Sequence, residues 1–203
     1  MARRGPDEGR VGLRPALILS RSRDRGTIAL VQSPVVRLAS SDDARAVAGL
    51  WWRARLAAVP AIPSPVHDEA DVRRWVAEVL IPAGGTWVAV EQEEVVAMIS
   101  LREGWIDQLY VDPARQGCSM GTRLVDFAKA RAPEGLDLWT FQTNRGARRF
   151  YERHGFTAVE WTDGDNEEGA PDVCYRWTPG GRAQSASIPR TSPSSSDHAA
   201  TPE

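Results

Sequence analysis

Hydrophobic positions divide the chain into a patterned centre and two unpatterned ends. Apolar residues recur at helical and strand spacings between residues 35 and 177. Residues 1–34 are instead rich in Arg and Gly without a clear period, and residues 179–203 are Ser/Pro-rich. A chain of 203 residues with 42% hydrophobic content can bury one good core but is short for two. We therefore expect one domain over residues 35–178, with disordered segments at 1–34 and 179–203.

The first half of the centre predicts one strand followed by two helices. Residues 35–38 form a short apolar run, and Ser40 followed by Asp43 has the spacing of a capping box at a helix start. This first helix should end near Pro60, and a proline-rich loop leads to the second. The predicted buried faces contain Val47, Leu50, Trp51, Ala54 and Ala58 in the first helix, and Val72, Trp75, Val76 and Val79 in the second.

The second half predicts mainly strands. Three β-like runs cover residues 86–90, 95–101 and 105–111, and the first two are separated by a polar turn. A helix over 120–131, a strand over 136–141, a helix over 145–154 and strands over 156–161 and 173–177 follow. The expected element order is therefore β-αα-βββ-α-β-α-ββ.

The segment from Leu109 to Thr122 is the first with chemical content, because a strand there breaks into a polar turn that opens a helix. At such a junction several backbone N–H groups have no partner within the helix, and they converge with the positive end of the helix dipole. Gly117 and Gly121 let the backbone approach a pyrophosphate closely, and Arg115 and Arg123 add positive charge. An anion fits this turn, although a purely structural turn has the same local features.

The spacing of the turn excludes two common nucleotide motifs. A P-loop needs four residues between its glycines and a following Lys, whereas three residues separate Gly117 from Gly121 and Thr122 follows. The dinucleotide pattern G-x-G-x-x-G is not matched either.

A second segment, residues 144–156, predicts an amphipathic helix with both ends marked. Asn144 suits the N-terminal cap and Gly155 suits the left-handed position after the last turn. The residues that fall on one face are Ala147, Phe150, Tyr151 and His154. Each has a packing explanation, and Tyr151 taken alone reads as an amphipathic core residue.

The two segments together resemble the cofactor motifs of the GNAT superfamily of acetyl-CoA-dependent N-acyltransferases. The first reads V-x-P-x-x-Q-G-x-x-x-G, and about thirty residues later comes N-x-x-A-x-x-F-Y-x-x-x-G-F. The resemblance extends over residues 35–177, including the element order. It implies an α/β fold of the α+β kind: a mixed, mostly antiparallel sheet of about six to seven strands, with helices on both faces and splayed central strands.

The resemblance also implies a mechanism. Acetyl-CoA would be the cosubstrate, and an acetyl group would pass to a primary amine by direct attack in a ternary complex. Backbone groups of Leu109 and Val111 would bond the pantetheine arm, Asn144 would contact it from the far side, and Tyr151 would be the general acid for the leaving thiolate. The cofactor-binding set that the resemblance implies comprises Leu109, Tyr110, Val111, Gln116, Gly117, Cys118, Ser119, Met120, Gly121, Thr122 and Asn144.

Two positions depart from the usual family pattern Q/R-x-x-G-x-G/A. Ser119 stands where glycine is usual, so a side chain would weaken pyrophosphate contact if that backbone needs an unusual dihedral angle. Cys118 occupies a position that is often basic. We expect Cys118 to be buried or partly buried and a bystander, because no activating His lies at a readable spacing.

The sequence leaves the identity of the general base open. Asp107 has the same strand parity as Leu109 and Val111, which would point its carboxylate towards the cleft, directly or through a water; a solvated aspartate is the alternative. Acidic side chains could attract a cationic amine or serve only solubility. These acidic residues are Glu103, Asp163, Asp165, Glu167 and Glu168.

Charge and cysteine content restrict the partners and the cellular location of the protein. A formal net charge of −2 gives no global attraction to nucleic acid or anionic membrane. Two cysteines are too few for a disulfide framework, and no spacing joins them to the histidines as a metal site. No apolar run approaches the ~20 residues that cross a bilayer, and the short one near residue 17 is bracketed by Arg14 and Arg21 rather than resembling an export signal. We expect a cytoplasmic protein without a metal, a monomer or homodimer, acting on an amine-bearing small molecule or peptide and not on nucleic acid.

Three other functions stay open. The domain could bind CoA without catalysis, although Tyr151 and Asn144 together favour an enzyme. The Arg-rich arm could bind nucleic acid, which strong salt dependence abolished by deleting residues 1–34 would reveal. A different phosphate-binding α/β enzyme would bind ATP or NAD.

Overall fold

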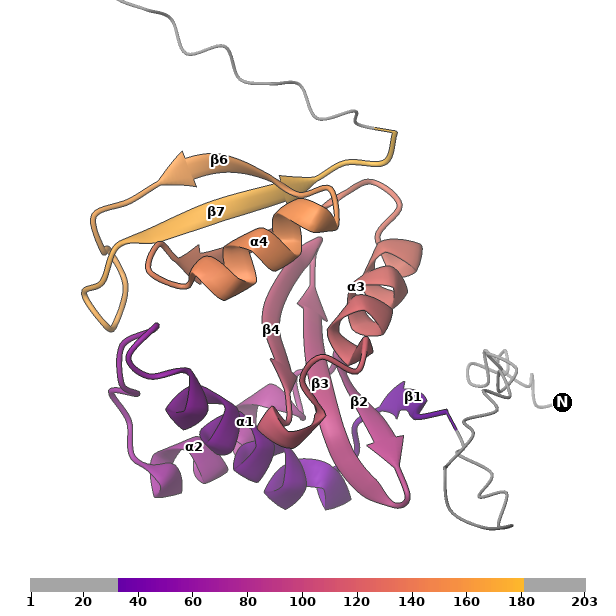
Figure 1. Ribbon diagram of the computed structural model, residues 1–203. Coiled ribbons are helices and arrows are strands. Elements are labelled where there is room, and N and C mark those ends of the chain that lie inside the picture. Colours follow the sequence, from indigo (N-terminus) through magenta and orange to yellow (C-terminus); the bar gives the residue numbers. More distant parts are fainter. Residues whose placement is uncertain (1–32, 181–203) are drawn as a thin grey trace, which may run out of the picture.

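One mixed sheet organises the protein, seen in a computed structural model that describes residues 33–180 (Figure 1). Its seven strands lie in the order β1-β2-β3-β4-β5-β7-β6. Every neighbouring pair is antiparallel except β4 and β5, which are parallel. The strands are β1 (Val35–Leu38), β2 (Thr86–Glu91), β3 (Glu94–Arg102), β4 (Trp105–Val111), β5 (Leu136–Phe141), β6 (Thr157–Trp161) and β7 (Asp172–Trp177). The predicted α+β class and element order are confirmed. The predicted terminal segments lie outside the described residues, apart from Ser33, Pro34, Pro179 and Gly180.

Helices cover both faces of the sheet, as predicted. α1 (Ala44–Ala58) and α2 (Glu69–Trp75) pack one cluster of buried residues against Val88 and Met98. α3 (Met120–Arg131) and α4 (Arg145–Arg153) belong to the other cluster, which contains Leu136 and Leu138 of β5. Three short helical turns are η1 (Ser41–Asp43), η2 (Val76–Leu80) and η3 (Pro113–Arg115). Figure 1 shows α1 and α2 below the sheet and α3 and α4 on its other side.

Four positions of the predicted helical faces are less buried than expected: Trp51, Ala58 and Trp75 are half-buried, and Val79 is exposed. Val79 was expected to be buried but is 52% exposed, and Leu80 takes its place in the core. The cause is η2, a π-helical turn whose wider backbone rotates the residues after Val76 off the α-helical period. Trp51 is only half-buried, because its ring lies against Trp52, Trp75 and Tyr110 at the border of the core.

The predicted capping interaction at Ser40 is present. The Asp43 carboxylate accepts hydrogen bonds from the Ser40 backbone N–H (2.8 Å) and hydroxyl (3.0 Å). It also accepts two from the Arg37 guanidinium, at 2.7 and 2.8 Å. Chiefly because of Arg37, the pKa of Asp43 falls to about 2. The start of the helical region is therefore anchored to β1.

The parallel strands β4 and β5 diverge almost at once. Their ladder consists of Trp105 paired with Asp137, reinforced by the hydrogen bond from the Asp137 N–H to the Gly104 carbonyl at 2.9 Å. The predicted splay is thus present, and it opens the middle of the sheet. One half holds β1 to β4, and the other holds β5, β7 and β6.

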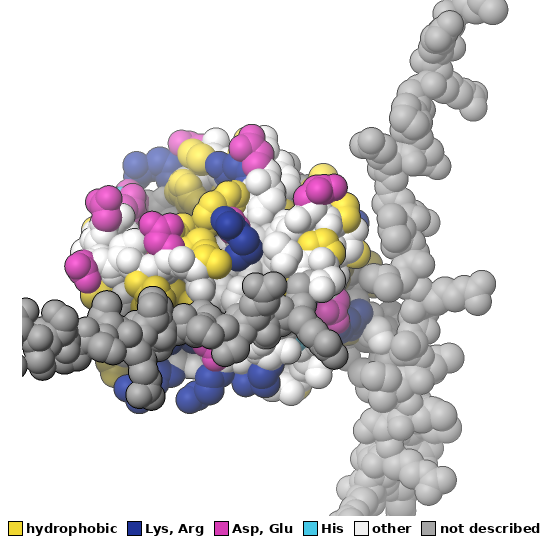
Figure 2. All heavy atoms as spheres, turned by 90° about the horizontal axis from the view of Figure 1, so that it is seen from above, with side chains coloured by type: hydrophobic (Ala, Val, Ile, Leu, Met, Phe, Trp, Pro, Cys, Tyr) yellow, Lys and Arg dark blue, Asp and Glu magenta, His cyan; other side chains and the backbone are white. Residues whose placement is uncertain are grey.

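The edge strand β6 exposes two large hydrophobic side chains. Val159 and Trp161 of β6 are about half exposed, and the Arg148 guanidinium carbon lies 4.8 Å from the Trp161 ring centroid. Figure 2, which looks down on this end of the molecule, shows hydrophobic side chains interspersed with Lys and Arg. Within residues 33–180, none of the helices combines the length and apolar character that crossing a bilayer requires.

Candidate active site

The backbone of β4 faces the gap at alternate residues. The Asp112 N–H donates to the Val96 carbonyl of β3 at 2.9 Å, so the polar groups of residue 112 point towards β3. Because backbone direction alternates along a strand, the N–H and C=O groups of Val111 and Leu109 point the other way, into the gap beside β5. These are the two residues whose backbone was predicted to bond an extended ligand.

After β4 the chain makes a tight turn outward. The Asp112 carboxylate accepts a hydrogen bond from the Ala114 N–H at 2.9 Å, and η3 follows. Gly117 and Ser119 both have positive φ, at 79° and 59°. For Ser119 this is the left-handed conformation that costs a residue with a Cβ about 1–2 kcal/mol. The unusual dihedral angle considered from the sequence is therefore present.

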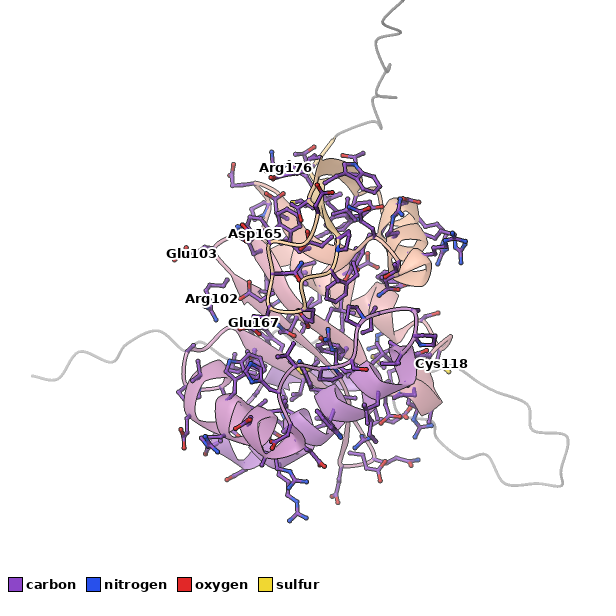
Figure 3. All side chains as sticks on the ribbon, turned by 90° about the vertical axis from the view of Figure 1, so that its left-hand side faces the viewer. Arg102, Glu103, Cys118, Asp165, Glu167 and Arg176 are labelled. Atoms are coloured by element: carbon purple, nitrogen blue, oxygen red, sulfur yellow. The ribbon has the colours of Figure 1, made fainter. Side chains whose placement is uncertain are left out.

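Cys118 lies between these two left-handed residues and is exposed, so its expected burial was wrong. The turn carries residues 116–119 away from the core before Met120 returns to it. In Figure 3 Cys118 lies on the opposite side of the molecule from Arg102 and Glu103.

The first turn of α3 presents backbone donors. The first helical bond runs from the Arg123 N–H to the Ser119 carbonyl, and the Ser119 side chain makes no capping bond. The N–H groups of Met120, Gly121 and Thr122 thus come before the first intrahelical donor and have no acceptor within the helix, as at helix N-termini that bind anions. The two expected arginines are engaged elsewhere: Arg115 pairs with Glu91 at 3.1 Å, and Arg123 donates to the Pro34 carbonyl at 3.0 Å.

The two sequence motifs touch each other between α3 and α4. A Cβ atom at Gly121 would lie 3.1 Å from the Phe150 ring, so glycine permits this contact. The Thr122 hydroxyl lies 3.1 Å from His154 Nε2. Asn144 caps α4 as predicted, since its side-chain oxygen accepts from the Ala147 N–H at 3.1 Å. The turn before α3 is therefore fixed to the helix that carries Tyr151.

A cavity of about 150 Å³ occupies the gap between β4 and β5. Tyr151 and Asn144 of the second motif line it together with Leu109 and Tyr110 of the first, and Asp107 does so as well. The remaining lining residues are Arg55, Ile62, Ile106, Gln108, Trp139, Thr140, Phe141 and Ala147. The structure thus brings the predicted catalytic pair and part of the predicted binding set into one space.

Tyr151 has the environment of a neutral acid. It is 8% exposed and packs against Phe150 and Phe156. Burial, and to a lesser extent the neighbouring Tyr110, raises the pKa of Tyr151 well above its ordinary value. The phenol therefore keeps its proton throughout the neutral range.

Asp107 reaches the cavity for a different reason from the one predicted. Ser100 pairs with Gln108 and Leu101 with Ile106, so Asp107 is the extra residue of a β-bulge in β4. The strand-parity argument was wrong, because the bulge breaks the alternation and Ile106 joins Leu109 and Val111 in the buried cluster. The Asp107 side chain is 32% exposed and lies 3.4 Å from Arg102. Partial burial raises the pKa of Asp107, and Arg102 lowers it by a smaller amount.

Sequence reasoning missed Arg55. It follows Trp51 by four residues on α1 and so lies on the same helical face, a position where a charged residue is unexpected. Its side chain is 8% exposed, donates to Glu168 at 2.6 Å and lines the cavity. A basic residue one helical turn after a core position was the signal that could have identified it.

The acidic residues are divided in space. Glu168 reaches α1 through Arg55, and Glu167 lies 3.5 Å from His67. Figure 1 shows the loop between β6 and β7 descending towards the connection between α1 and α2, and Figure 3 places Asp165 and Glu167 on it. Through Glu168 this loop therefore contacts Arg55, one of the residues that line the cavity.

A larger hollow of about 890 Å³ lies elsewhere. It is bordered by α1, α2, η3 and the β2–β3 hairpin, and the residues that line it include Arg45, Arg73 and Arg115. Neither Tyr151 nor residues 116–122 contribute to it. In residues 33–180, no three His, Cys, Asp or Glu side chains are grouped to hold a metal ion.

This combination of a splayed sheet, a helix-start anion turn and a buried tyrosine defines an acyl-CoA-binding fold. The model of the acetyltransferase (GNAT) family matches residues 46–156, and the chain belongs to that family. The predicted family is thereby confirmed.

Relatives with curated names match part of the chain. The peptidyl-lysine N-acetyltransferase YjaB of Escherichia coli is 33% identical over 87 residues, which is 42% of this chain and 58% of that protein. Its Salmonella typhimurium counterpart gives a similar match. The chain thus spans less than two thirds of the length of these relatives.

Solved structures share the fold. The apo form of E. coli YjaB matches with a TM-score of 0.59 and 23% identity, covering 70% of this chain and 96% of that one. A PaiA N-acetyltransferase from Thermoplasma acidophilum, solved with coenzyme A, matches with a TM-score of 0.53 and 15% identity, covering 72% and 99%.

Proposed function

We propose that this protein is an N-acetyltransferase that transfers the acetyl group of acetyl-CoA to a primary amine. The observation that carries the proposal is the shared cavity, in which Tyr151, Asn144, Leu109 and Asp107 meet at the splay of β4 from β5. Family membership supports acetyl-CoA as cosubstrate, and one solved relative was obtained with coenzyme A.

The cofactor would be held by the residues predicted for it. The backbone N–H groups of the 116–122 turn and the first turn of α3 would bind the pyrophosphate. Leu109 and Val111 would bond the pantetheine arm as an added strand does, with Tyr110 between them and Asn144 on the far side. Acetyl-CoA, when bound, supplies the activated thioester carbonyl.

The remaining chemistry is positioning and proton transfer. Hydrogen bonds from β4 orient the thioester and stabilise charge on its carbonyl oxygen. Tyr151 donates its phenolic proton to the departing thiolate, for which its buried, neutral state is suited. Asp107 receives a proton from the attacking amine, directly or through water, and its raised pKa improves it as a base.

The acceptor and location are proposed more broadly. An amine on a small molecule or on a protein lysine is consistent with the chemistry, and YjaB is described as a peptidyl-lysine N-acetyltransferase. A cytoplasmic location is supported by two cysteines, Cys118 and Cys174, that are both free. The other readings lack such support: a silent CoA-binding domain does not use Tyr151, and nucleic-acid binding would rest on residues outside those described.

The test compares two Tyr→Phe variants. Tyr151→Phe should keep acetyl-CoA binding by calorimetry while amine-dependent thiol release falls about 10²-fold. Tyr175→Phe is the control: Tyr175 is buried and hydrogen-bonded to Glu152 at 2.7 Å but lies outside the cavity lining. Loss of the Tyr175 hydroxyl should lower the stability of the protein and leave its turnover near the wild-type value. Unchanged turnover in Tyr151→Phe would remove the acid assignment, and absence of acetyl-CoA binding in the wild type would remove the function.

A further inference from the structure

The cavity beside Tyr151 contains a buried cation that the acetyl-transfer chemistry does not use. The Arg55 side chain is more than nine-tenths buried, and its guanidinium carbon lies 5.4 Å from the Trp51 ring and 5.7 Å from the Phe141 ring. Aromatic rings near a guanidinium hold its plane and leave its N–H edges for hydrogen bonds.

Those edges are only partly used. Among the contacts of residues 33–180, one guanidinium nitrogen donates to Glu168 at 2.6 Å, the guanidinium also interacts with the Tyr110 hydroxyl, and the buried Nε has no hydrogen-bond partner. A guanidinium has five N–H donors in a fork that matches a carboxylate with two parallel bonds. A buried donor without a partner is costly, so the side chain is suited to a second planar anion.

The position of Arg55 indicates whether an acceptor would contact the arginine or its partner Glu168. Arg55 lines the cavity whereas Glu168 does not, so a molecule in the cavity lies next to Arg55 rather than next to Glu168. Asp107 lines the same cavity from β4. The space thus carries a carboxylate and a guanidinium, which complement the two ends of a molecule that has both an amine and a carboxylate.

The size of the cavity limits that molecule. A volume of about 150 Å³ is well below the roughly 300–1,000 Å³ of sites for drug-sized ligands. The loop that carries Glu168 is also braced, since Asn166 donates to Asp172 at 3.0 Å and Gln142 donates to the Thr162 carbonyl at 2.9 Å. A small acceptor therefore fits this space better than a bulky one.

We propose that the acceptor is a small amino acid-like amine whose carboxylate binds Arg55. This inference rests on the proposed transferase function and gives it a substrate class. Arg55 acts as a specificity residue, with its guanidinium fixed by Glu168, Trp51 and Phe141. Asp107 and Tyr151 remain at the reacting end of the acceptor.

The experiment compares acceptors that differ only in their carboxylate. Thiol release from acetyl-CoA is followed with small amino acids, with the primary amides of the same amino acids, and with an end-blocked lysine peptide. Rates are corrected for the fraction of free amine. The wild type should prefer the acid over its amide by roughly 10- to 100-fold in kcat/KM, the size of a lost charge-assisted hydrogen-bond pair.

Variants of Arg55 test the residue itself. Arg55→Gln should remove this preference, mainly through a higher KM for the acid, so that the acid and its amide have the same kcat/KM. Arg55→Lys should keep part of it, because an ammonium provides charge without the planar fork. Arg45→Gln is the matched control, since Arg45 is an exposed residue of the same helix and lines the other hollow; it should behave as wild type.

A binding readout separates substrate recognition from catalysis. In the presence of CoA, calorimetry should show tighter binding of an N-acetylated amino acid than of its amide, and Arg55→Gln should equalise the two. Amides or blocked peptides used as well as acids would overturn the Arg55 proposal alone. If no amine accelerates thiol release, the transferase function itself fails. If Arg55→Gln does not fold, the acid-over-amide preference of the wild type and of Arg55→Lys still tests the Arg55 proposal.

Discussion

Gly121 lies against the ring of Phe150, so a methyl group at residue 121 would lie 3.1 Å from Cζ of Phe150. Phe150 in turn packs edge-on against Tyr151, with ring centroids 5.2 Å apart. The first turn of α3 and the buried tyrosine are therefore separated by a single ring. A change at the turn should be felt at the tyrosine because packed interiors transmit small displacements.

This contact predicts coupling between residues 121 and 150. Gly121→Ala should lower both acetyl-CoA affinity and turnover, because Phe150 must shift by a few tenths of an ångström and displace Tyr151. Phe150→Leu should reduce that loss, giving an interaction energy of about 0.5–3 kcal/mol in a double-mutant cycle. Strictly additive effects of the two substitutions on acetyl-CoA affinity would argue against the contact.

We expect replacement of Ser119 by glycine to stabilise the protein. Its φ of 59° costs a residue with a Cβ about 1–2 kcal/mol, part of which glycine loses again through its larger unfolded-state entropy. Ser119→Gly should therefore raise the free energy of unfolding by up to about 1 kcal/mol and tighten CoA binding by calorimetry. Ser119→Ala keeps the Cβ and serves as the control; an Ala variant as stable as the Gly variant would contradict the strain argument.

We expect the protonation of Asp107 to cause the fall in activity on the acid side of the pH–rate profile, the acid limb. If its carboxylate is the base, kcat/KM should fall as pH drops through a pKa above the usual aspartate value. Asp107→Asn should lose that limb together with most of the activity. Arg102→Gln should move the limb to higher pH, because the arginine 3.4 Å away lowers the pKa of Asp107. A limb that stays in place in Arg102→Gln would assign it to another group.

Asp43 predicts a pH-dependent contribution to stability. Its folded-state pKa of about 2 lies below the unfolded value of about 3.9, so its contribution is present above pH 4 and is lost as pH falls towards 2. The difference corresponds to about 2–3 kcal/mol. Asp43→Asn should lower the free energy of unfolding by about that amount at pH 7 and by far less near pH 2. Asp42→Asn, which changes the exposed neighbouring residue, should show no such pH dependence.

Local sequence patterns determined much of this protein. The periods of apolar residues placed every strand and the main helices to within one or two residues, since period and capping depend on neighbours along the chain. The turn after Val111 and the amphipathic helix around Tyr151 were readable for the same reason. The spacing of about thirty residues between these two motifs in the sequence, together with the element order, was enough to indicate the family.

The tertiary structure decided what the site contains. Asp107 enters the cavity because β3 and β4 pair with a bulge, and Arg55 has a carboxylate partner because the β6–β7 loop brings Glu168 to α1. Cys118 is exposed because two left-handed residues turn the chain outward around it. Strand register and loop contacts join residues far apart in sequence, and no local period encodes them. The sequence thus determined the elements and the cofactor turn, whereas long-range packing selected the side chains that face the acceptor.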